Sequence, residues 1–253
     1  MSNWALNYYR KTLTGVDVQV YDRIYLGWEK SQQGIALPLN LPNDDETNDI
    51  VTRVAMDHPE IFWVDYYSYT LQHFGMGAVN FCRTLRFNFF FDAPRQEALR
   101  QQAYAWRERI CRQIPPGLSK SDQLWMLYDY LSRQVTYGEK GNAQSHTILG
   151  CFLPNNHISV CEGISKGFKF LCDGMGIPCI VVTGTALSTS RTRGGHAWNL
   201  VSVNGKYRHL DVTSELTRAK RQGIAPRDGY LHTDKEMREY HYQWNAAHVP
   251  AAY

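Results

Sequence analysis

The chain has 253 residues, of which 43% are hydrophobic, 13% aromatic and 20% charged. This composition excludes a disordered polar chain, and the length suits one catalytic domain with an N-terminal extension. Lysine and arginine exceed aspartate and glutamate by 27 − 24 = 3, and the basic residues are scattered along the chain. We therefore expect neither a nucleic-acid partner nor a membrane association.

The N-terminal sequence and the cysteines indicate the cellular compartment in which the protein is expected to fold. Residues 1–11 lack a basic start followed by an apolar segment, and no run of about 18 apolar residues occurs anywhere. Six cysteines could form three disulfides, but a chain of this length does not need such cross-links. Unless a leader has been removed, we expect free thiols and a cytoplasmic location.

Residues 1–93 are predicted to form a mostly helical region with a strand pair. Apolar residues recur at helical spacing in 20–28 and again in 50–55, and the glycine, prolines and aspartates of 31–45 indicate a loop between them. Residues 61–69 are rich in aromatic and β-branched side chains, and 79–91 alternate between apolar and mostly polar ones. Both patterns favour strands.

Residues 94–253 are predicted to form the catalytic domain. Helical spacing follows Pro94, and a second helix is predicted to begin at Ser119, with Asp122 three residues on as in a capping motif. After a predicted loop over residues 137–156, the chain is expected to form one helix and three short strands. The fold class is therefore α+β.

Cys161 is predicted to stand at the start of a helix. Ile164, Phe168, Leu171 and Met175 fall on one helical stripe that ends near Gly174 and Gly176. The unpaired N–H groups at a helix start stabilise a thiolate, and they can also hold an oxyanion.

Most cysteines in folded proteins are buried packing residues, and this is the default interpretation for each one. Cys172 lies inside the same helical pattern, and Cys179 opens an apolar run typical of a buried strand. Cys151 is expected to pack as well, although a Cys151–Cys161 disulfide acting as a redox lock is a less favoured alternative. Cys161 alone has the setting of a nucleophile.

His196 and Asp211 are predicted to meet across a β-hairpin. Asn204-Gly205 between two alternating runs favours a two-residue type I′ turn. Paired residue numbers then sum to 409, so that Trp198 faces Asp211 and His196 faces Thr213. His196 and Asp211 become diagonal neighbours on one face, about 7–8 Å apart at Cα.

These three side chains would form a catalytic triad. Cys161 would attack a carbonyl carbon, His196 would protonate the leaving amine, and Asp211 would fix the tautomer of the imidazole. Trp198 would shield the His–Asp pair or simply pack, and His209 would support the site or pack. No zinc-ligand spacing and no phosphate-binding glycine loop occurs, so no metal or cofactor is expected.

The motifs around these residues carry a family resemblance. Val160-Cys161-Glu162-Gly163 opening a helix, Gly195-His196-Ala197-Trp198-Asn199 on a strand and His209-Leu210-Asp211-Val212-Thr213 after it resemble the core of the transglutaminase-like superfamily. The resemblance implies a papain-like α+β fold and acyl transfer at an amide bond. One departure is Ser159, where a glycine is expected before Val160.

The resemblance leaves the reaction open between hydrolysis of a peptide or amide and transfer of a glutamine acyl group to an amine. A bacterial peptidase or amidase acting on a peptide or protein substrate is favoured, because the accessory features of animal cross-linking enzymes are missing from the sequence. The alternative is a non-catalytic protein-interaction module on the same fold. Tyr137 and His146 are weak candidates for an oxyanion donor, and neither the substrate nor the oligomeric state follows from the sequence.

Overall fold

The computed structural model describes most of the chain, in two compact units that divide between Arg100 and Gln101. It covers residues 7–38, 43–76, 79–138, 143–153, 157–187, 191–223 and 230–253, without the side chains of 74–82, 217–218 and 220–222. No helix within these ranges is both long enough and apolar enough to cross a bilayer. The densest group of basic residues in the sequence, Arg218, Lys220 and Arg221, has its side chains outside the described part.

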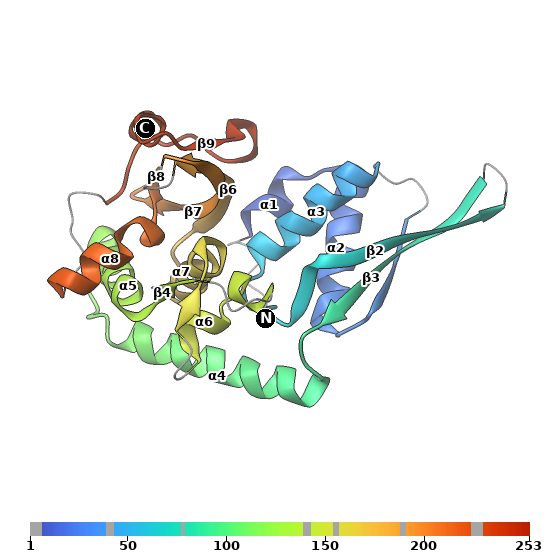
Figure 1. Ribbon diagram of the computed structural model, residues 1–253, viewed down its shortest axis with the longest axis horizontal. Coiled ribbons are helices and arrows are strands. Elements are labelled where there is room, and N and C mark those ends of the chain that lie inside the picture. Colours follow the sequence, from blue (N-terminus) through green and yellow to red (C-terminus); the bar gives the residue numbers. More distant parts are fainter. Residues whose placement is uncertain are drawn as a thin grey trace. The chain divides into compact units, whose positions relative to one another are not determined.

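The first unit combines three helices with an antiparallel sheet of strand order β1-β3-β2 (Figure 1). The helices are α1 (Tyr8–Thr12), α2 (Gly15–Glu29) and α3 (Asp44–Asp57), and the strands are β1 (Gly34–Leu37), β2 (Val64–Met76) and β3 (Val79–Phe89). The predicted helices and strand pair are confirmed. The predicted loop over 31–45 is wrong in part, because β1 pairs with β3 and buries Ile35 and Leu37.

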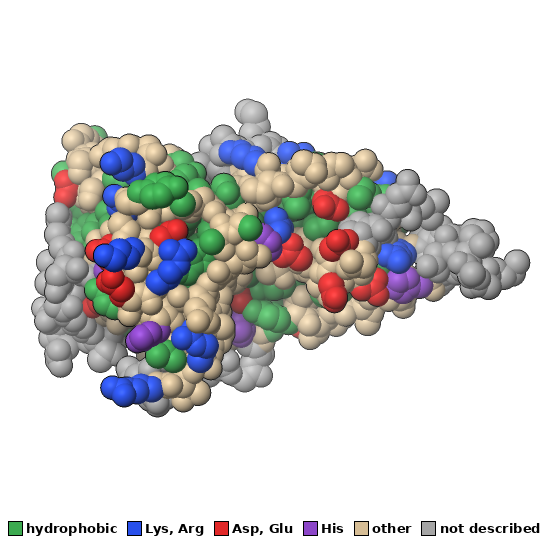
Figure 2. Space-filling view, turned by 90° about the horizontal axis from the view of Figure 1, so that it is seen from above, with side chains coloured by type: hydrophobic (Ala, Val, Ile, Leu, Met, Phe, Trp, Pro, Cys, Tyr) green, Lys and Arg blue, Asp and Glu red, His purple; other side chains and the backbone are tan. Residues whose placement is uncertain are grey.

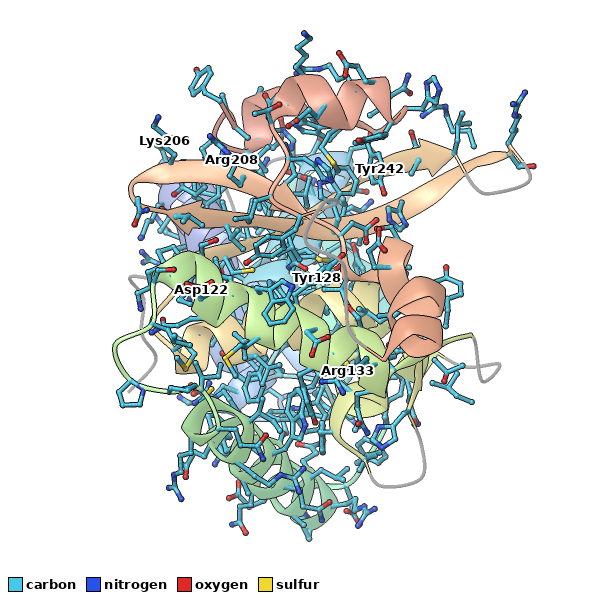
Figure 3. The ribbon with its side chains drawn as sticks, turned by 90° about the vertical axis from the view of Figure 1, so that its left-hand side faces the viewer. Asp122, Tyr128, Arg133, Lys206, Arg208 and Tyr242 are labelled. Carbon is cyan, nitrogen blue, oxygen red and sulfur yellow. The ribbon has the colours of Figure 1, made fainter. Side chains whose placement is uncertain are left out.

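A long helix, α4 (Ala93–Arg112), runs through the division between the units and is followed by α5 (Lys120–Gln134). The N-cap of α5 is Ser119, whose hydroxyl accepts a hydrogen bond from the amide of Asp122, as the capping motif predicted. Figure 3 looks onto α5, with Asp122 near one end of the helix, Arg133 near the other and Tyr128 between them.

The second unit is built around α7 (Cys161–Gly174), which packs on the antiparallel sheet β8-β7-β6-β9. The strands of that sheet are β6 (Cys179–Leu187), β7 (Arg193–Val203), β8 (Lys206–Leu210) and β9 (Gln243–Trp244). Shorter elements surround them: β4 (Thr136–Tyr137), η2 (Ala143–His146), α6 (Leu149–Phe152), β5 (Ile158–Ser159), α8 (Val212–Gln222), α9 (Asp234–Glu239) and η3 (Ala246–His248). The α+β class, with the cysteine helix on an antiparallel sheet, is confirmed.

The buried stripe of α7 holds that helix against the sheet. Ile164, Phe168 and Leu171 are fully buried, as the helical spacing predicted. Burying each of these side chains contributes about 1.5–3 kcal/mol relative to leaving it exposed. The N-terminal residue of α7 is thereby fixed in place by the core beneath it.

The β7–β8 hairpin has the predicted register up to Leu210. Val203 pairs with Lys206 and Leu200 with His209, and the turn residues Asn204 and Gly205 have φ of 51° and 76°. The pairings predicted beyond this point, of Trp198 with Asp211 and of His196 with Thr213, are wrong. The chain leaves the sheet at Asp211, which caps α8.

On the face shown in Figure 2, basic and acidic groups are interspersed and do not gather into one basic patch.

Candidate active site

Cys161 is the first residue of α7, as predicted, and its side chain is partly exposed. The chain just before it is anchored to the η2 segment: the amide of Val160 donates to the carbonyl of Ser145 (3.2 Å), and so does the hydroxyl of Ser159 (2.9 Å). Ser159 stands where the family pattern led us to expect a glycine. Its fully buried side chain therefore serves to hold the residues that precede the thiol.

Gly163 lets this anchoring segment approach the first turn of α7. A Cβ built on Gly163 would lie 2.2 Å from Ser159 Oγ and 2.5 Å from the carbonyl oxygens of Ser145 and Thr147. No side chain fits there without displacing backbone. The glycine in the Val-Cys-Glu-Gly motif is thus explained by close packing beside the thiol.

His196 and Asp211 are in direct contact. His196 Nε2 donates to Asp211 Oδ2 at 2.8 Å, and the side chains are only 15% and 5% exposed. Asp211 accepts two further hydrogen bonds, from the Thr213 amide to Oδ1 (2.9 Å) and from the Tyr242 hydroxyl to Oδ2 (2.6 Å). The carboxylate is therefore held by three donors in a fixed orientation.

The electrostatics of this pair favour its charged form. Burial lowers the pKa of His196, but hydrogen bonds to Asp211 and Cys161, together with their charges, outweigh it and raise the pKa to about 10. Burial raises the pKa of Asp211. The hydrogen bond and charge of His196, together with the hydrogen bonds from Tyr242 and Thr213, outweigh burial and bring this pKa below its ordinary value. Since Nε2 of His196 is hydrogen-bonded to Asp211, Nδ1 is the ring nitrogen that can interact with Cys161.

The Cys–His–Asp cluster lies within a segment that matches a known family. A sequence profile of the transglutaminase-like superfamily matches residues 95–212. This segment belongs to the transglutaminase-like superfamily. Members of the superfamily include transglutaminases and cysteine proteases, and cysteine-dependent chemistry is typical of them. No curated protein sequence matches the chain.

Solved structures similar to this chain share little sequence with it. One is a TGase, with 12% identity and a TM-score of 0.37 over 71% of this chain and 50% of its own. A candidate cysteine protease from Cytophaga hutchinsonii has 13% identity and a TM-score of 0.37 over 74% of this chain and 71% of its own. The periplasmic domain of TgpA from Pseudomonas aeruginosa has 14% identity and a TM-score of 0.32 over 56% and 59%. This chain thus spans half the length of the first of them.

Trp198 of the transglutaminase-like domain supports the histidine. Its ring is stacked on His196, with 6.0 Å between centroids and 19° between planes, and its indole N–H donates to His209 Nδ1 at 2.9 Å. An indole only donates, so His209 carries its proton on Nε2 and donates to Asp234 Oδ1 at 2.9 Å. Burial lowers the pKa of His209 and keeps it neutral. His209 therefore supports the site through Trp198, one of the two roles left open for it.

Asn199 ties β7 to the cysteine helix. It is fully buried, and its Nδ2 donates to the carbonyl of Ser165 in α7 at 2.9 Å. His196 lies three residues earlier on β7, and Cys161 four residues before Ser165 on α7. This bond therefore fixes the two elements that carry the thiol and the imidazole.

The two candidate oxyanion donors lie on elements next to the start of α7. Tyr137 is 55% exposed on β4, whose partner β5 ends two residues before Cys161. His146 lies in η2 and its Nδ1 is 3.2 Å from Glu162 Oε2, next to Cys161 in the chain. The oxyanion role of either residue stays a prediction.

The other cysteines for which the structure describes a side chain are free thiols. Cys151 is buried, and its Sγ lies 3.5 Å from the carbonyl oxygen of Gly163. Burial raises the pKa of Cys151 to about 12. The alternative of a Cys151–Cys161 disulfide is not what the structure contains.

Two supporting residues were missed from the sequence. Asn199 belongs to the motif around His196, and a polar residue between apolar neighbours on a buried strand indicates a side-chain hydrogen bond. Tyr242 follows Asp211 by 31 residues and carries no local signal. Only the fold brings its hydroxyl to the carboxylate.

Proposed function

We propose that this chain is a cysteine-dependent enzyme that transfers an acyl group from an amide, with Cys161 as nucleophile, His196 as acid and base, and Asp211 as the residue that orients His196. One observation carries the proposal: the imidazole of His196 is bound by Asp211 at 2.8 Å, and the Cys161 thiol at the start of α7 is among the groups that raise the pKa of His196. A Cys–His pair oriented by a carboxylate is the arrangement that activates a thiol.

The first half-reaction forms a thioester. The Cys161 thiolate attacks the carbonyl carbon of the amide, and the carbonyl electrons move to the oxygen of a tetrahedral intermediate. Under this proposal the unpaired amide N–H groups at the start of α7 stabilise that oxyanion. When the C–N bond breaks, the imidazolium of His196 gives its proton to the leaving nitrogen, and the free amine departs.

The second half-reaction releases the acyl group. Neutral His196 takes a proton from water or from a second amine, which attacks the thioester carbon and expels the Cys161 thiolate. Water yields a carboxylic acid, and an amine yields a new amide. Asp211 favours the imidazolium in both halves because its carboxylate accepts from Nε2.

The substrate class under this proposal is an amide carried by a peptide or protein. We favour hydrolysis over transfer to an amine because Cys161 is partly exposed in the free enzyme, so that water can reach a thioester formed there. The cytoplasmic location expected from the sequence remains a prediction.

Mass spectrometry distinguishes the reactions. The purified protein is incubated with a library of glutamine-containing peptides, with and without a primary amine, beside the Cys161→Ala variant. Peptide cleavage, deamidation and transamidation each give a different mass change. A product that Cys161→Ala fails to form supports the proposal, whereas products formed equally by the variant would exclude Cys161 as the nucleophile.

The non-catalytic alternative makes a different prediction. An interaction module has no need of an activated thiol, so Cys161 would react with alkylating reagents no faster than an ordinary exposed cysteine. Rapid alkylation that depends on His196 therefore separates an enzyme from a binding module even when the natural substrate is missing from the library.

A further inference from the structure

A cavity of about 320 Å³ adjoins the His196–Asp211 pair. It is lined by Arg193, Arg238, His241, Tyr242, Gln243 and Trp244. Tyr242 joins it to the candidate active site, because the hydroxyl bonds Asp211 and the ring packs edge-on against His196, with 5.6 Å between centroids. A group bound in this cavity would lie one side chain away from the catalytic pair.

The cavity is cationic. None of its six lining residues is acidic, and two are arginines. Arg193 Nη1 donates to Thr185 Oγ1 (3.1 Å) and to the carbonyl of His241 (3.0 Å), and both acceptors are neutral. Among the described residues no carboxylate forms an ion pair with Arg193, so its guanidinium is oriented by the protein while its charge is left uncompensated.

Arg238 adds less positive charge to the cavity than Arg193 does, and it forms part of the cavity wall. Its guanidinium lies 3.7 Å from Asp234 Oδ2, so this charge is partly compensated, and it is stacked 4.9 Å above the ring of Trp244. The rings of Trp244 and Tyr242 give the cavity apolar walls beside its charged groups. Such a site suits a short aliphatic stem that ends in an anion.

The backbone that forms the cavity is fixed. His241 has φ of 65°, a left-handed conformation that side-chain-bearing residues seldom adopt, and this turn directs its carbonyl to Arg193. The next residues pair with β6, Gln243 with Thr185 and Trp244 with Gly184. A Cβ on Gly184 would lie 2.1 Å from the carbonyl oxygen of Gln243, so the C-terminal segment is packed tightly onto the sheet.

We propose that this cavity is a substrate subsite that binds a carboxylate, with Arg193 as its main anchor. The inference rests on the proposed function and deepens it, because it gives the enzyme a preference for acidic peptides. The carboxylate can come from an aspartate or glutamate side chain or from the C-terminus of a peptide. An arginine fork binds a carboxylate through two N–H donors, so Arg193 can keep its orienting bonds through Nη1 and present its other N–H groups to the ligand.

The test uses reactive peptides, so no natural substrate has to be known. Iodoacetyl peptide amides ending in glutamate or in glutamine are compared, with spacers of up to about three glycines to span the distance from Cys161 to the cavity. A third set ends in glutamine with a free C-terminal carboxylate, which separates the two sources of the anion. The rate of Cys161 alkylation is measured on the full chain by mass spectrometry, with iodoacetamide as the neutral reference.

For at least one spacer length we expect a carboxylate probe to alkylate Cys161 roughly fivefold faster than the matching neutral probe. The expected gain is modest because Arg193 is exposed to solvent. Arg193→Gln should abolish this preference, and Arg193→Lys should keep part of it. Arg112→Gln is the matched control: it removes the same charge from a residue 79% exposed that pairs with Glu108. The preference should survive that change.

The outcomes are distinct. Equal rates for acidic and neutral probes at every spacer, with fast iodoacetamide alkylation, would overturn the subsite and leave the proposed function intact. If the faster alkylation by carboxylate probes persists in Arg193→Gln, or is lost equally in Arg112→Gln, the cause is general charge attraction. Either result would overturn the subsite as well. Slow reaction of Cys161 with iodoacetamide itself would remove the proposed function and the subsite together.

Discussion

The hydroxyl of Tyr242 donates a 2.6 Å hydrogen bond to Oδ2 of Asp211, the same oxygen that accepts from His196. Burial and the Asp211 carboxylate raise the pKa of Tyr242, so it stays a neutral donor. Tyr242→Phe removes only this donor. We expect Cys161 alkylation to slow by roughly tenfold, as for the loss of a hydrogen bond to a charged group, with little change in the melting temperature.

The control for this prediction is Tyr240→Phe, because Tyr240 is 57% exposed and its ring packs against His232, away from the His196–Asp211 pair. Alkylation in that variant should match the wild type. If Tyr242→Phe also alkylates at the wild-type rate, the hydrogen bond to Asp211 has no part in orienting His196.

The pKa of His196 depends on both of its partners. Cys161→Ala removes a hydrogen bond and a charge that raise it, so the pKa should fall from about 10 toward its ordinary value, and Asp211→Asn should have the same effect. A titration of the imidazole by NMR measures this directly. A value unchanged in both variants would show that neither partner binds the imidazolium.

The same shift links stability to pH. Because the pKa of His196 is raised on folding, its contribution is fully present below the unfolded value of about 6.5 and is lost as the pH rises through about 10. Chemical denaturation between these limits should show the wild type losing stability relative to His196→Ala. Parallel pH profiles for the two proteins would contradict the shift.

The tight packing around Gly163 predicts that an alanine at this position lowers stability. Gly163→Ala places a methyl group within 2.2–2.5 Å of Ser159 Oγ and of two carbonyl oxygens, which should lower the free energy of unfolding by about 1–3 kcal/mol and slow alkylation of Cys161. Gly194→Ala is the control, since a Cβ there meets no atom within 4 Å. Thermal unfolding of both variants measures the difference, and equal melting temperatures would contradict the account of the motif.

The hydrogen bond from Asn199 to Ser165 makes a further prediction. Asn199→Ala breaks the bond to Ser165 and should destabilise the chain by about 1–3 kcal/mol while slowing alkylation of Cys161. Asn88→Ala is its counterpart on the surface, where Asn88 donates to the carbonyl of Ser68. Denaturant unfolding should show a lower free energy of unfolding for Asn199→Ala and almost no change for Asn88→Ala. Equal decreases in the two variants would contradict the anchoring role of Asn199.

Local patterns were enough to predict much of the fold. The Asn204-Gly205 turn set the hairpin register, because left-handed φ values at both positions select a type I′ turn. The helical stripe of α7 placed Cys161 at a helix start. Both patterns depend on residues close in sequence, which is why they could be recognised without a structure.

Other features could not be predicted so well, for physical reasons. The alternation that predicts the hairpin continues through Asp211 and Thr213, whereas an aspartate N-cap with Glu215 in the first turn indicates the start of α8. Strand β1 has only four residues, and its pairing with β3 is a long-range contact. Tyr242 is brought to Asp211 by tertiary structure alone.

The measurement that most directly tests the central claim is the rate at which iodoacetamide alkylates each cysteine near pH 6–7. Burial raises the pKa of Cys111, Cys151 and Cys172, so these thiols are slow internal references. We predict that Cys161 reacts faster than every reference by about a hundredfold or more and that His196→Ala removes the advantage. Slow alkylation of Cys161 at the rate of Cys111, unchanged by His196→Ala, would contradict the claim.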